Sequence, residues 1–250
     1  MERLLEATRR AEAKHFWFRG FRRFVRPLLA EAAAGTERPR LLDCGCGTGA
    51  NLRLLAEFGR PFGLDLTRVG LECARASGLP RLTRGTVACL PFPDGIFDVV
   101  TSFDVLYCLP DEEEPRAAAE MHRVLRPGGA AVVNVAAMPV LKGNHSVLSN
   151  EIRRYTPRRL RAVLETAGFR ILRLTYTNAT MFPLMLAVRT VQRAVGLASP
   201  DNAEREIRVP PVPINAALDA VLALESRVLG WIDMPFGSSL LCLARKPPTK

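Results

Sequence analysis

The sequence predicts an α/β fold in which a mostly parallel sheet is covered by helices on both faces. Short apolar runs alternate with amphipathic helical segments from Arg40 onward, which is the pattern of consecutive strand–helix units. A glycine-rich turn follows the first run, and the second run ends in an acidic residue about twenty positions later. The chain of 250 residues is long enough for one such domain with appended segments.

The expected strands share short apolar or β-branched runs that are bounded by turn residues. They are residues 40–45, 61–66, 82–87, 97–103, 130–137, 169–177 and 239–245. Helices are expected between them at 49–58, 67–77, 112–125 and 157–168. In the last of these, Thr156 is placed to cap the helix, Pro157 to occupy its first turn and Gly168 to end it.

Residues 1–34 are expected to form a helical cap in front of a domain that spans 35–250. Gly20 and Pro27 are expected to interrupt the helices of this cap. The cap contains a run of one histidine and three aromatic residues, 15–18. This run either packs the cap onto the domain or forms a lid over a ligand site.

A segment of about sixty residues, 179–237, separates the last two strands and is far too long for a hairpin turn. Helices are expected at 181–195 and 214–229, around a polar, proline-rich stretch at 202–213. This insertion could roof a pocket, form a dimer contact or rest on a membrane. Its apolar face is expected to pack on the domain, because a basic amphipathic stripe with aromatic anchors is not evident in the sequence.

Composition narrows the class of protein. The net charge is +10, but the arginines are scattered, which favours general solvation over a dedicated basic face. The six cysteines form no C-x-x-C pair, so neither a metal site nor a disulfide framework is expected. No apolar run is long enough for a membrane span, and the charged N-terminus does not resemble a secretory signal. These features indicate a cytoplasmic protein.

The glycine-rich turn, 45–49, has the spacing G-x-G-x-G. Glycine lets the backbone approach a ligand closely, as in nucleotide-type cofactor sites. No lysine follows the turn, and Asp43 just before it would repel a phosphate. The turn therefore suits a ligand with a cationic or zwitterionic end. Asp65, at the end of the second strand, can accept hydrogen bonds from both hydroxyls of a ribose.

These features resemble the class I S-adenosylmethionine-dependent methyltransferases, of the small-molecule, type 11-like kind. The resemblance covers about residues 40–178 and 239–246. It implies a Rossmann-like sheet of seven strands in the order 3-2-1-4-5-7-6, with the last two strands antiparallel. It also implies S-adenosylmethionine as cofactor and S-adenosylhomocysteine as product.

The resemblance extends to individual cofactor-binding positions. Residues 41–49 resemble the first motif of the family, and 84–98 resemble the third. In the third motif, Thr86 stands where the family usually has an aspartate that binds the adenine amino group, so its hydroxyl or the neighbouring backbone would hold the adenine. The implied cofactor-binding residues are Asp43, Gly45, Cys46, Gly47, Gly49, Asp65, Leu66, Thr86, Val87, Ala88, Ser102 and Phe103.

Residues near the reacting groups follow from the place where the ligand of an open α/β sheet lies, beyond the ends of the first and fourth strands. The expected substrate contacts are Trp17, Arg19, Leu106, Tyr107 and Tyr155, although Tyr155 is equally suited to packing. If the acceptor arrives protonated, a base is needed. The expected groups for this role are His145, Tyr107 and His15, with Asp104 as a further alternative.

The implied reaction is in-line methyl transfer to a small biosynthetic metabolite, a lipid or a quinone-type acceptor. The protein then aligns the nucleophile and excludes water. No [DN]-P-P-[FYW] motif follows the fourth strand, which argues against methylation of base amines. Two alternatives remain: an RNA-directed enzyme that uses the basic surface, and a non-catalytic cofactor-binding protein, which Thr86 mildly favours. A nucleic-acid partner is not expected, and a homodimer through the insertion stays open.

Overall fold

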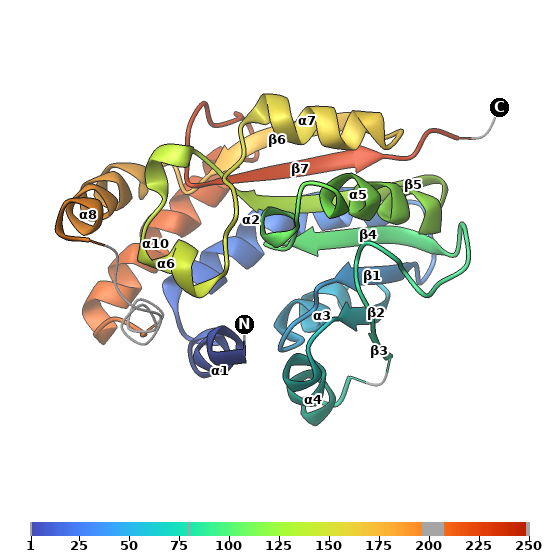
Figure 1. Ribbon diagram of the computed structural model, residues 1–250, viewed down its shortest axis with the longest axis horizontal. Helices are drawn as coiled ribbons and strands as arrows, with labels where there is room; N and C mark the ends of the chain where they lie inside the picture. The colour runs from blue at the N-terminus through green and yellow to red at the C-terminus, as the bar shows by residue number, and fades with distance from the viewer. Residues whose placement is uncertain (1, 80, 197–207, 249–250) are drawn as a thin grey trace.

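The fold is a seven-stranded sheet with helices on both faces, seen in a computed structural model that describes residues 2–79, 81–196 and 208–248 (Figure 1). The strand order is β3-β2-β1-β4-β5-β7-β6, which confirms the predicted topology. Strands β1 to β5 pair in parallel, and β7 is antiparallel to both β5 and β6. The order reverses between β1 and β4, so the carboxyl ends of these strands frame the switch point.

The strands lie close to their predicted ranges. Their bounds are β1 Arg40–Cys44, β2 Arg60–Asp65, β3 Leu82–Arg84, β4 Phe97–Phe103, β5 Leu125–Ala136, β6 Arg170–Thr177 and β7 Ser239–Arg245. Strand β5 begins five residues before its predicted start, because Leu125 pairs with Phe97 ahead of a register shift. Gly128, with φ +78°, allows the turn within this shift.

Two hydrophobic cores lie on opposite faces of the sheet (Figure 1). Helices α5 (Glu113–Val124) and α7 (Pro157–Thr166) bury Met121 and Leu160 on one face. Helices α2 (Phe16–Ala33), α3 (Ala50–Leu55) and α10 (Val212–Val228) cover the other. Helix α4 (Arg68–Ala76) follows β2. Burial of apolar side chains on both faces is what holds a parallel sheet of this kind together.

The caps of α7 match the prediction. Thr156 Oγ1 accepts a hydrogen bond from the Arg159 N–H, and Pro157 occupies the first turn. Gly168, with φ +97°, follows the end of the helix and donates its N–H to the Glu165 carbonyl. These contacts satisfy backbone groups that would otherwise lack partners at the helix ends.

The N-terminal cap consists of α1 (Glu2–Ala11) and α2. Helix α2 runs without a break through Gly20 and Pro27, so the predicted interruptions at these residues are wrong. Packing explains Gly20: a Cβ at this position would lie 2.5 Å from Leu222 Cδ1 of α10, so the glycine lets two helices approach closely. The chain bends instead between the two helices, before residue 16.

The insertion contains α8 (Phe182–Val195) and α10, as the sequence predicted. Half of the predicted polar stretch 202–213, residues 202–207, lies outside the described residues. Helix α10 packs on α2, where Asn215 Oδ1 accepts the Phe16 N–H at 2.9 Å. Within the described range 182–195, no side chain of α8 is buried. The expectation that the apolar face of the insertion packs on the domain is therefore wrong for the exposed apolar residues of α8, although Met185 on its other side packs against the core.

Three short elements near the site were not predicted: the 3₁₀ turns η1 (Leu106–Cys108) and η2 (Pro139–Leu141), and helix α6 (Asn144–Leu148). All three follow strands β4 and β5 and lie in the loops beyond the carboxyl ends of those strands. Among the described residues, no helix is both long and apolar enough to span a membrane.

Candidate cofactor and substrate site

A cavity of about 520 Å³ lies beyond the carboxyl ends of β1, β2 and β4. Its walls come from the glycine-rich turn, the end of β2, the segment after β3, the segment after β4 and the N-terminal cap. A volume of this size is typical of small-molecule and cofactor sites. The cavity therefore occupies the position in which open α/β sheets bind their ligands.

The glycine-rich turn is tied to the end of β2. The N–H groups of Gly45 and Cys46 both donate to the Leu64 carbonyl, at 2.7 and 2.9 Å. Gly45 has φ +87°, and a Cβ there would lie 2.3 Å from Val105 Cγ2. Two constraints therefore favour glycine at position 45: the positive φ, and the close approach of the segment after β4, which leaves no room for a side chain. The turn presents Gly45, Cys46 and Gly47 to the cavity.

Gly49 has a different position from the other two glycines of the turn. It is the N-cap of α3 with φ +82°, and a Cβ there would lie 2.8 Å from Ala74 Cβ of α4. Gly49 does not belong to the described residues that line the cavity. It allows α3 to start close to α4, and so contributes to the site through packing.

Asp65 lies at the end of β2 and faces the cavity. Its Oδ2 accepts the Gly47 N–H at 2.7 Å, and its Oδ1 accepts the backbone N–H and the hydroxyl of Thr67 at 2.8 and 2.6 Å. Three protein donors thus occupy three of the roughly four acceptor positions of the carboxylate. One acceptor position is left, so a ribose that donates both of its hydroxyls to Asp65 would have to share or replace one of these bonds.

Asp43 lies behind the turn, 1% exposed, and is not among the described residues that line the cavity. Its Oδ1 accepts the Thr101 hydroxyl at 2.7 Å, while its Oδ2 has no hydrogen-bond partner among the described residues. Desolvation, reinforced by the nearby charge of Asp65, raises the pKa of Asp43 to about 7. An unpartnered buried acceptor next to the turn fits a ligand that brings a donor or a positive charge.

Leu66 and the segment after β3 form a further wall of the cavity. Leu66 is 64% exposed and lines the cavity together with Gly85, Thr86 and Val87. The Thr86 hydroxyl accepts a hydrogen bond from the Ala88 N–H at 3.2 Å, so these two groups, both expected to bind a ligand, are hydrogen-bonded to each other. Ala88 does not belong to the described lining of the cavity.

The N-terminal cap closes the cavity. Its lining residues, from α1, α2 and the segment between them, are Leu5, Thr8, Glu12, Trp17, Phe18, Phe21 and Arg22. Phe21 packs edge-on against Phe103, with ring centroids 5.1 Å apart. Glu12 accepts the Thr48 hydroxyl at 2.6 Å, which links the cap to the glycine-rich turn. Within the run 15–18, Phe16 packs against the core, while Trp17 and Phe18 line the cavity.

Two predicted residues of the cap lie elsewhere. His15 is buried, and its Nδ1 accepts the Trp17 N–H at 3.1 Å, so it caps α2; burial lowers the pKa of its imidazole. The Arg19 guanidinium lies 3.0 Å from the Asp219 carboxylate of α10. Neither residue is among those described as lining the cavity. Their positions give them helix-capping and helix-pairing roles.

The segment after β4 brings Phe103, Asp104, Val105 and Tyr107 to the cavity. Asp104 has φ +62°, an uncommon conformation for a residue other than glycine and one that often marks a functional position. Its Oδ1 accepts the Asn134 side-chain N–H at 2.9 Å. The Asp104 side chain is exposed within the cavity, and desolvation by the surrounding protein raises its pKa to about 7.

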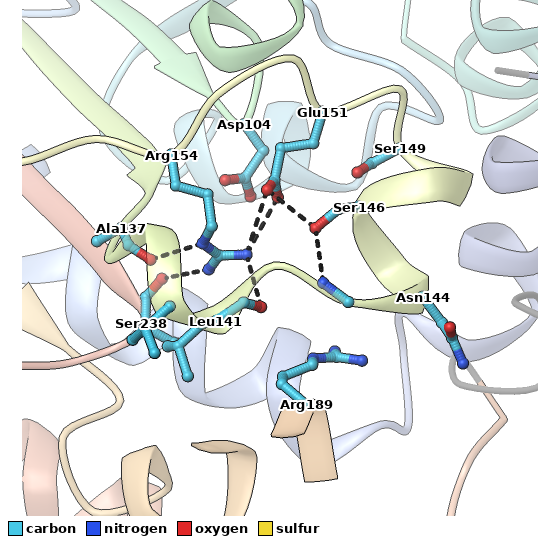
Figure 2. A network of polar contacts seen from close by, with 12 residues as sticks. Asp104, Ala137, Leu141, Asn144, Ser146, Ser149, Glu151, Arg154, Arg189 and Ser238 are labelled. Carbon is cyan, nitrogen blue, oxygen red and sulfur yellow. Dashed lines mark hydrogen bonds and ion pairs between the residues drawn. The ribbon is translucent and has the colours of Figure 1, made fainter. Parts of the chain in front are cut away.

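A buried polar network stands behind Asp104 (Figure 2). Glu151 accepts from Arg154 Nη1 at 3.1 Å and from the Ser146 hydroxyl at 2.9 Å. Arg154 also donates to the carbonyls of Ala137 and Ser238 at 2.7 and 3.1 Å. Figure 2 shows the carboxylates of Asp104 and Glu151 on the same side of the Arg154 guanidinium. The charge of Glu151 contributes to the raised pKa of Asp104, and that of Arg154 opposes it.

The remaining predicted residues differ in their access to the cavity. Tyr107 lines it, and burial raises the pKa of its phenol well above the usual value, so the phenol stays neutral. Leu106 is fully buried in the core, and Ser102 is 1% exposed with a hydroxyl that has no partner among the described residues. His145 lies in α6, but its side chain falls outside the described part of the chain.

Tyr155 is fully buried between α5 and α7. Its hydroxyl donates to Glu114, and the Arg159 guanidinium lies 5.8 Å from the centre of its ring. The sequence suggested either substrate contact or packing for Tyr155. Since it is not among the described residues that line the cavity, its position fits packing.

Sequence reasoning missed several residues that shape the site. Thr67 fixes Asp65, Phe21 packs on Phe103, and Asn134 holds Asp104. Thr67 carried a local signal, since it is the first residue of the predicted helix 67–77 and stands two positions after an acidic residue. Asn134 lies in the middle of an apolar strand, and a lone polar residue in such a position is a signal for a buried hydrogen bond.

Comparison with known proteins identifies the domain. Residues 42–133 match the family model of a methyltransferase domain, and this range holds the glycine-rich turn, Asp65 and Asp104. The chain contains a class I methyltransferase domain. Enzymes of this class use S-adenosylmethionine. Eight of the twelve residues expected to bind it line the cavity: Gly45, Cys46, Gly47, Asp65, Leu66, Thr86, Val87 and Phe103.

Three relatives share part of the methyltransferase domain. A Mycolicibacterium smegmatis protein named "probable S-adenosylmethionine-dependent methyltransferase" is 33% identical over 163 residues, 63% of this chain and 61% of its own length. The phthiotriol/phenolphthiotriol dimycocerosates methyltransferase of Mycobacterium leprae is 40% identical over 36% of this chain and 35% of its own. The demethylmenaquinone methyltransferase of Geobacillus kaustophilus is 39% identical over 42% and 48%. The match thus spans less than two thirds of each relative.

A solved structure extends the likeness to most of the chain. The [4+2]-cyclase SpnF is 26% identical, covers 90% of this chain and 80% of its own, and superposes with a TM-score of 0.57. A protein with this architecture can therefore carry a different named activity. Function has to be argued from the site.

Proposed function

We propose that this chain binds S-adenosylmethionine in the cavity and transfers its methyl group to a small, largely apolar acceptor that carries a hydroxyl, of the lipid or quinol type. The observation that carries the proposal is the arrangement of two carboxylates in one covered cavity. Asp65 lies in the wall formed by β1 and β2, and Asp104 lies in the wall that follows β4. Aromatic side chains of the cap close the space between them.

Residues of the cavity fit the cofactor. The glycine-rich turn offers a bare backbone, Asp65 offers carboxylate oxygens for a ribose, and Leu66 with Val87 offers an apolar wall for a base. The unpartnered Oδ2 of Asp43 lies behind the turn, where a cationic group would compensate its charge. When bound, S-adenosylmethionine supplies a methyl group on a sulfonium, which needs no further activation.

Asp104 is placed to take the proton of an acceptor hydroxyl. It faces the cavity, Asn134 holds one of its oxygens, and its raised pKa suits proton transfer near neutral pH. Tyr107 beside it stays neutral and can orient the acceptor through its hydroxyl. Trp17, Phe18 and Phe21 exclude water from the cavity, which strengthens the electrostatic interactions within it.

The character of the acceptor follows from the lining. Most of the lining surface is apolar and includes Leu5, Phe18, Phe21 and Leu109, although polar side chains such as Arg22, Asn51 and Ser149 also reach the cavity. Two relatives carry names that refer to lipid and quinone acceptors, which supports an acceptor of this kind. The six free cysteines fit a reducing, cytoplasmic location and a role in biosynthesis.

The basic surface gives the RNA-directed alternative little support. Three arginines of the basic stretch 153–159 are engaged with acids: Arg153 with Asp111, Arg154 with Glu151 and Arg159 with Glu114. Among the described residues, these side chains therefore serve the fold.

The test is a transfer assay with methyl-labelled S-adenosylmethionine. The purified chain is incubated with hydroxylated lipids and quinols, with their O-methylated forms as controls, and with total RNA. We expect label in the lipid or quinol fraction, and none in the methylated controls or the RNA. Label confined to RNA would refute the proposed acceptor class. Cofactor binding without transfer to any acceptor would favour the non-catalytic alternative.

A further inference from the structure

Exposed apolar side chains gather on one part of the molecule. Sixteen large apolar side chains are exposed in the described ranges, and thirteen of them lie between Leu184 and Phe236. Single exposed apolar residues are normal on a soluble protein, but a concentrated patch marks an interaction surface. The insertion therefore carries a feature that the methyltransferase fold itself does not require.

Helix α8 presents a single apolar stripe outward. Leu184, Val188, Val191 and Val195 follow one another at intervals of four, three and four residues, which places them on one side of the helix. They are between 42% and 83% exposed. The other side of α8 faces the protein: Met185 packs against the core, and the Arg193 guanidinium donates to the Val140 carbonyl.

Helix α10 repeats this arrangement. Its inner side buries Asp219, Leu222 and Glu225 against α2 and the start of the insertion. Its outer side carries exposed apolar residues that lead to the exposed end of the helix: Val221, Leu224, Val228 and Trp231. Trp231 is 90% exposed and is followed by Ile232, which is 62% exposed. A tryptophan at the edge of an apolar surface is typical of a membrane–water interface.

A stripe of arginines borders α10. Helix α2 carries Arg19, Arg22, Arg23 and Arg26 at spacings that place them on one side of the helix. Together with Arg9 and Arg53 they line an open groove of about 1020 Å³, which also contains Glu12, Glu57 and Glu72. Arg19 and Arg23 pair with Asp219 of α10, and Arg26 pairs with Glu57, so the groove adjoins α10 on the same face of the sheet. Its six arginines still outnumber these four carboxylates, Asp219 included, so the groove keeps an excess of positive charge.

We propose that the surface formed by α2, α8 and α10 docks on a membrane surface that contains anionic lipids. The apolar side chains of α8 and α10 enter the boundary between headgroups and acyl chains, and the arginines of α2 meet lipid phosphates. Among the described residues no helix can cross a membrane, so the contact is interfacial. If this surface instead formed a two-fold dimer, the arginine stripes of the two copies would lie close together and repel each other. Anionic headgroups would neutralise the stripe, which favours a membrane as the partner.

The test is flotation with lipid vesicles, without cofactor or acceptor, so that its result does not depend on methyl transfer. Vesicles of pure phosphatidylcholine are compared with vesicles that also contain phosphatidylglycerol. We expect the wild type to float with the anionic vesicles at least about tenfold more strongly, and to be released at high salt. Arg26→Ala and Arg53→Ala should each lower binding about fivefold, because each removes one charge near the surface.

A second variant tests the apolar part. The double substitution L224E/W231E changes two exposed side chains and should reduce binding at least about tenfold. Arg158→Ala on α7, at the opposite face, and Ile152→Ser, an exposed apolar residue outside the insertion, serve as matched controls and should bind as the wild type does. The thermal midpoint of every variant is measured, so that loss of fold is recognised.

Two results would overturn the proposal. The first is a wild type that does not float with anionic vesicles, or that floats equally with all variants. The second is a wild-type dimer in sedimentation velocity that L224E/W231E splits into monomers, together with no vesicle binding. The second result would assign the surface to a second copy of the chain.

Discussion

The Asp65 carboxylate accepts the backbone N–H of Gly47 across 2.7 Å. One side chain at the end of β2 thereby holds the turn that leaves β1. The other oxygen of Asp65 is fixed by Thr67, the N-cap of α4. The two parts of the proposed cofactor site, the bare turn and the ribose-binding acid, are thus a single hydrogen-bonded unit.

Replacing Asp65 should therefore impair both the turn and cofactor binding. We expect Asp65→Ala to weaken S-adenosylmethionine binding by at least about a hundredfold, because it removes charged hydrogen bonds worth about 1.5–3 kcal/mol each. Calorimetric titration measures this effect. Thr67→Val, which removes one donor to Asp65 and keeps its charge, should weaken binding by about tenfold or less. Equal affinity in Asp65→Ala and the wild type would exclude Asp65 from the site.

The raised pKa of Asp104 predicts the pH dependence of catalysis. Its carboxyl has a pKa of about 7, so it is protonated, and inactive as a base, at lower pH. We expect kcat/KM to rise about tenfold per pH unit below 7 and to level off above it. Initial rates between pH 5 and 9 measure the profile, at saturating cofactor.

The variant Asp104→Asn keeps the shape of the side chain and removes the base. It should lower kcat by about 10²–10⁴-fold and abolish the rising limb of the profile. Cofactor affinity should stay within about threefold of the wild type, as a control for the fold. A variant that retains the wild-type rate or the same rising limb would assign the proton transfer to another group.

Tyr155 should matter for stability and not for substrate. Its hydroxyl donates to Glu114, whose side chain is 3% exposed, so Tyr155→Phe leaves a buried carboxylate with one donor fewer. We expect a loss of about 1–3 kcal/mol in the free energy of unfolding, measured with urea. The KM for the acceptor should not change. Tyr107→Phe is the matched comparison, for which we expect a changed KM and little change in stability.

The contact between Gly20 and Leu222 should appear as coupling between two helices. Alanine is ordinarily about 1 kcal/mol better than glycine in a helix. Because a Cβ at position 20 would lie 2.5 Å from Leu222 Cδ1, we expect Gly20→Ala to destabilise the protein by about 1–3 kcal/mol instead.

A double-mutant cycle separates this contact from helix propensity. In the background Leu222→Ala, which makes room for the new methyl group, Gly20→Ala should be neutral or stabilising. The difference between the two backgrounds is the coupling energy. Identical effects in both backgrounds would show that the two side chains do not compete for space.

Most elements could be predicted because their signals are local or periodic, whereas the strand order followed from the resemblance to the methyltransferase family. The helix signals around α7, Thr156, Pro157 and Gly168, are local and appear at their expected places. The break expected at Gly20 failed because a glycine in a helix has two meanings, weak propensity or close packing, and only the partner helix distinguishes them.

The site was harder to predict, since a sequence motif fixes the position of a residue but not the direction of its side chain. Asp65 and the turn follow directly from the ends of two strands, and they face the cavity. His15, Arg19 and Tyr155 were also expected at the site, but a helix cap, an ion pair and a buried carboxylate engage their side chains. The exposure of α8 could not be predicted either, because it depends on how the whole insertion packs on the domain.

The account depends most on one property, the binding of S-adenosylmethionine in the cavity that the cap covers. Calorimetric titration of the wild-type chain with S-adenosylmethionine and with S-adenosylhomocysteine tests it directly. We expect one site per chain for either ligand, with a Kd of about 1–100 μM, equivalent to roughly 5.5–8 kcal/mol. No detectable binding of either ligand by folded protein would contradict the account.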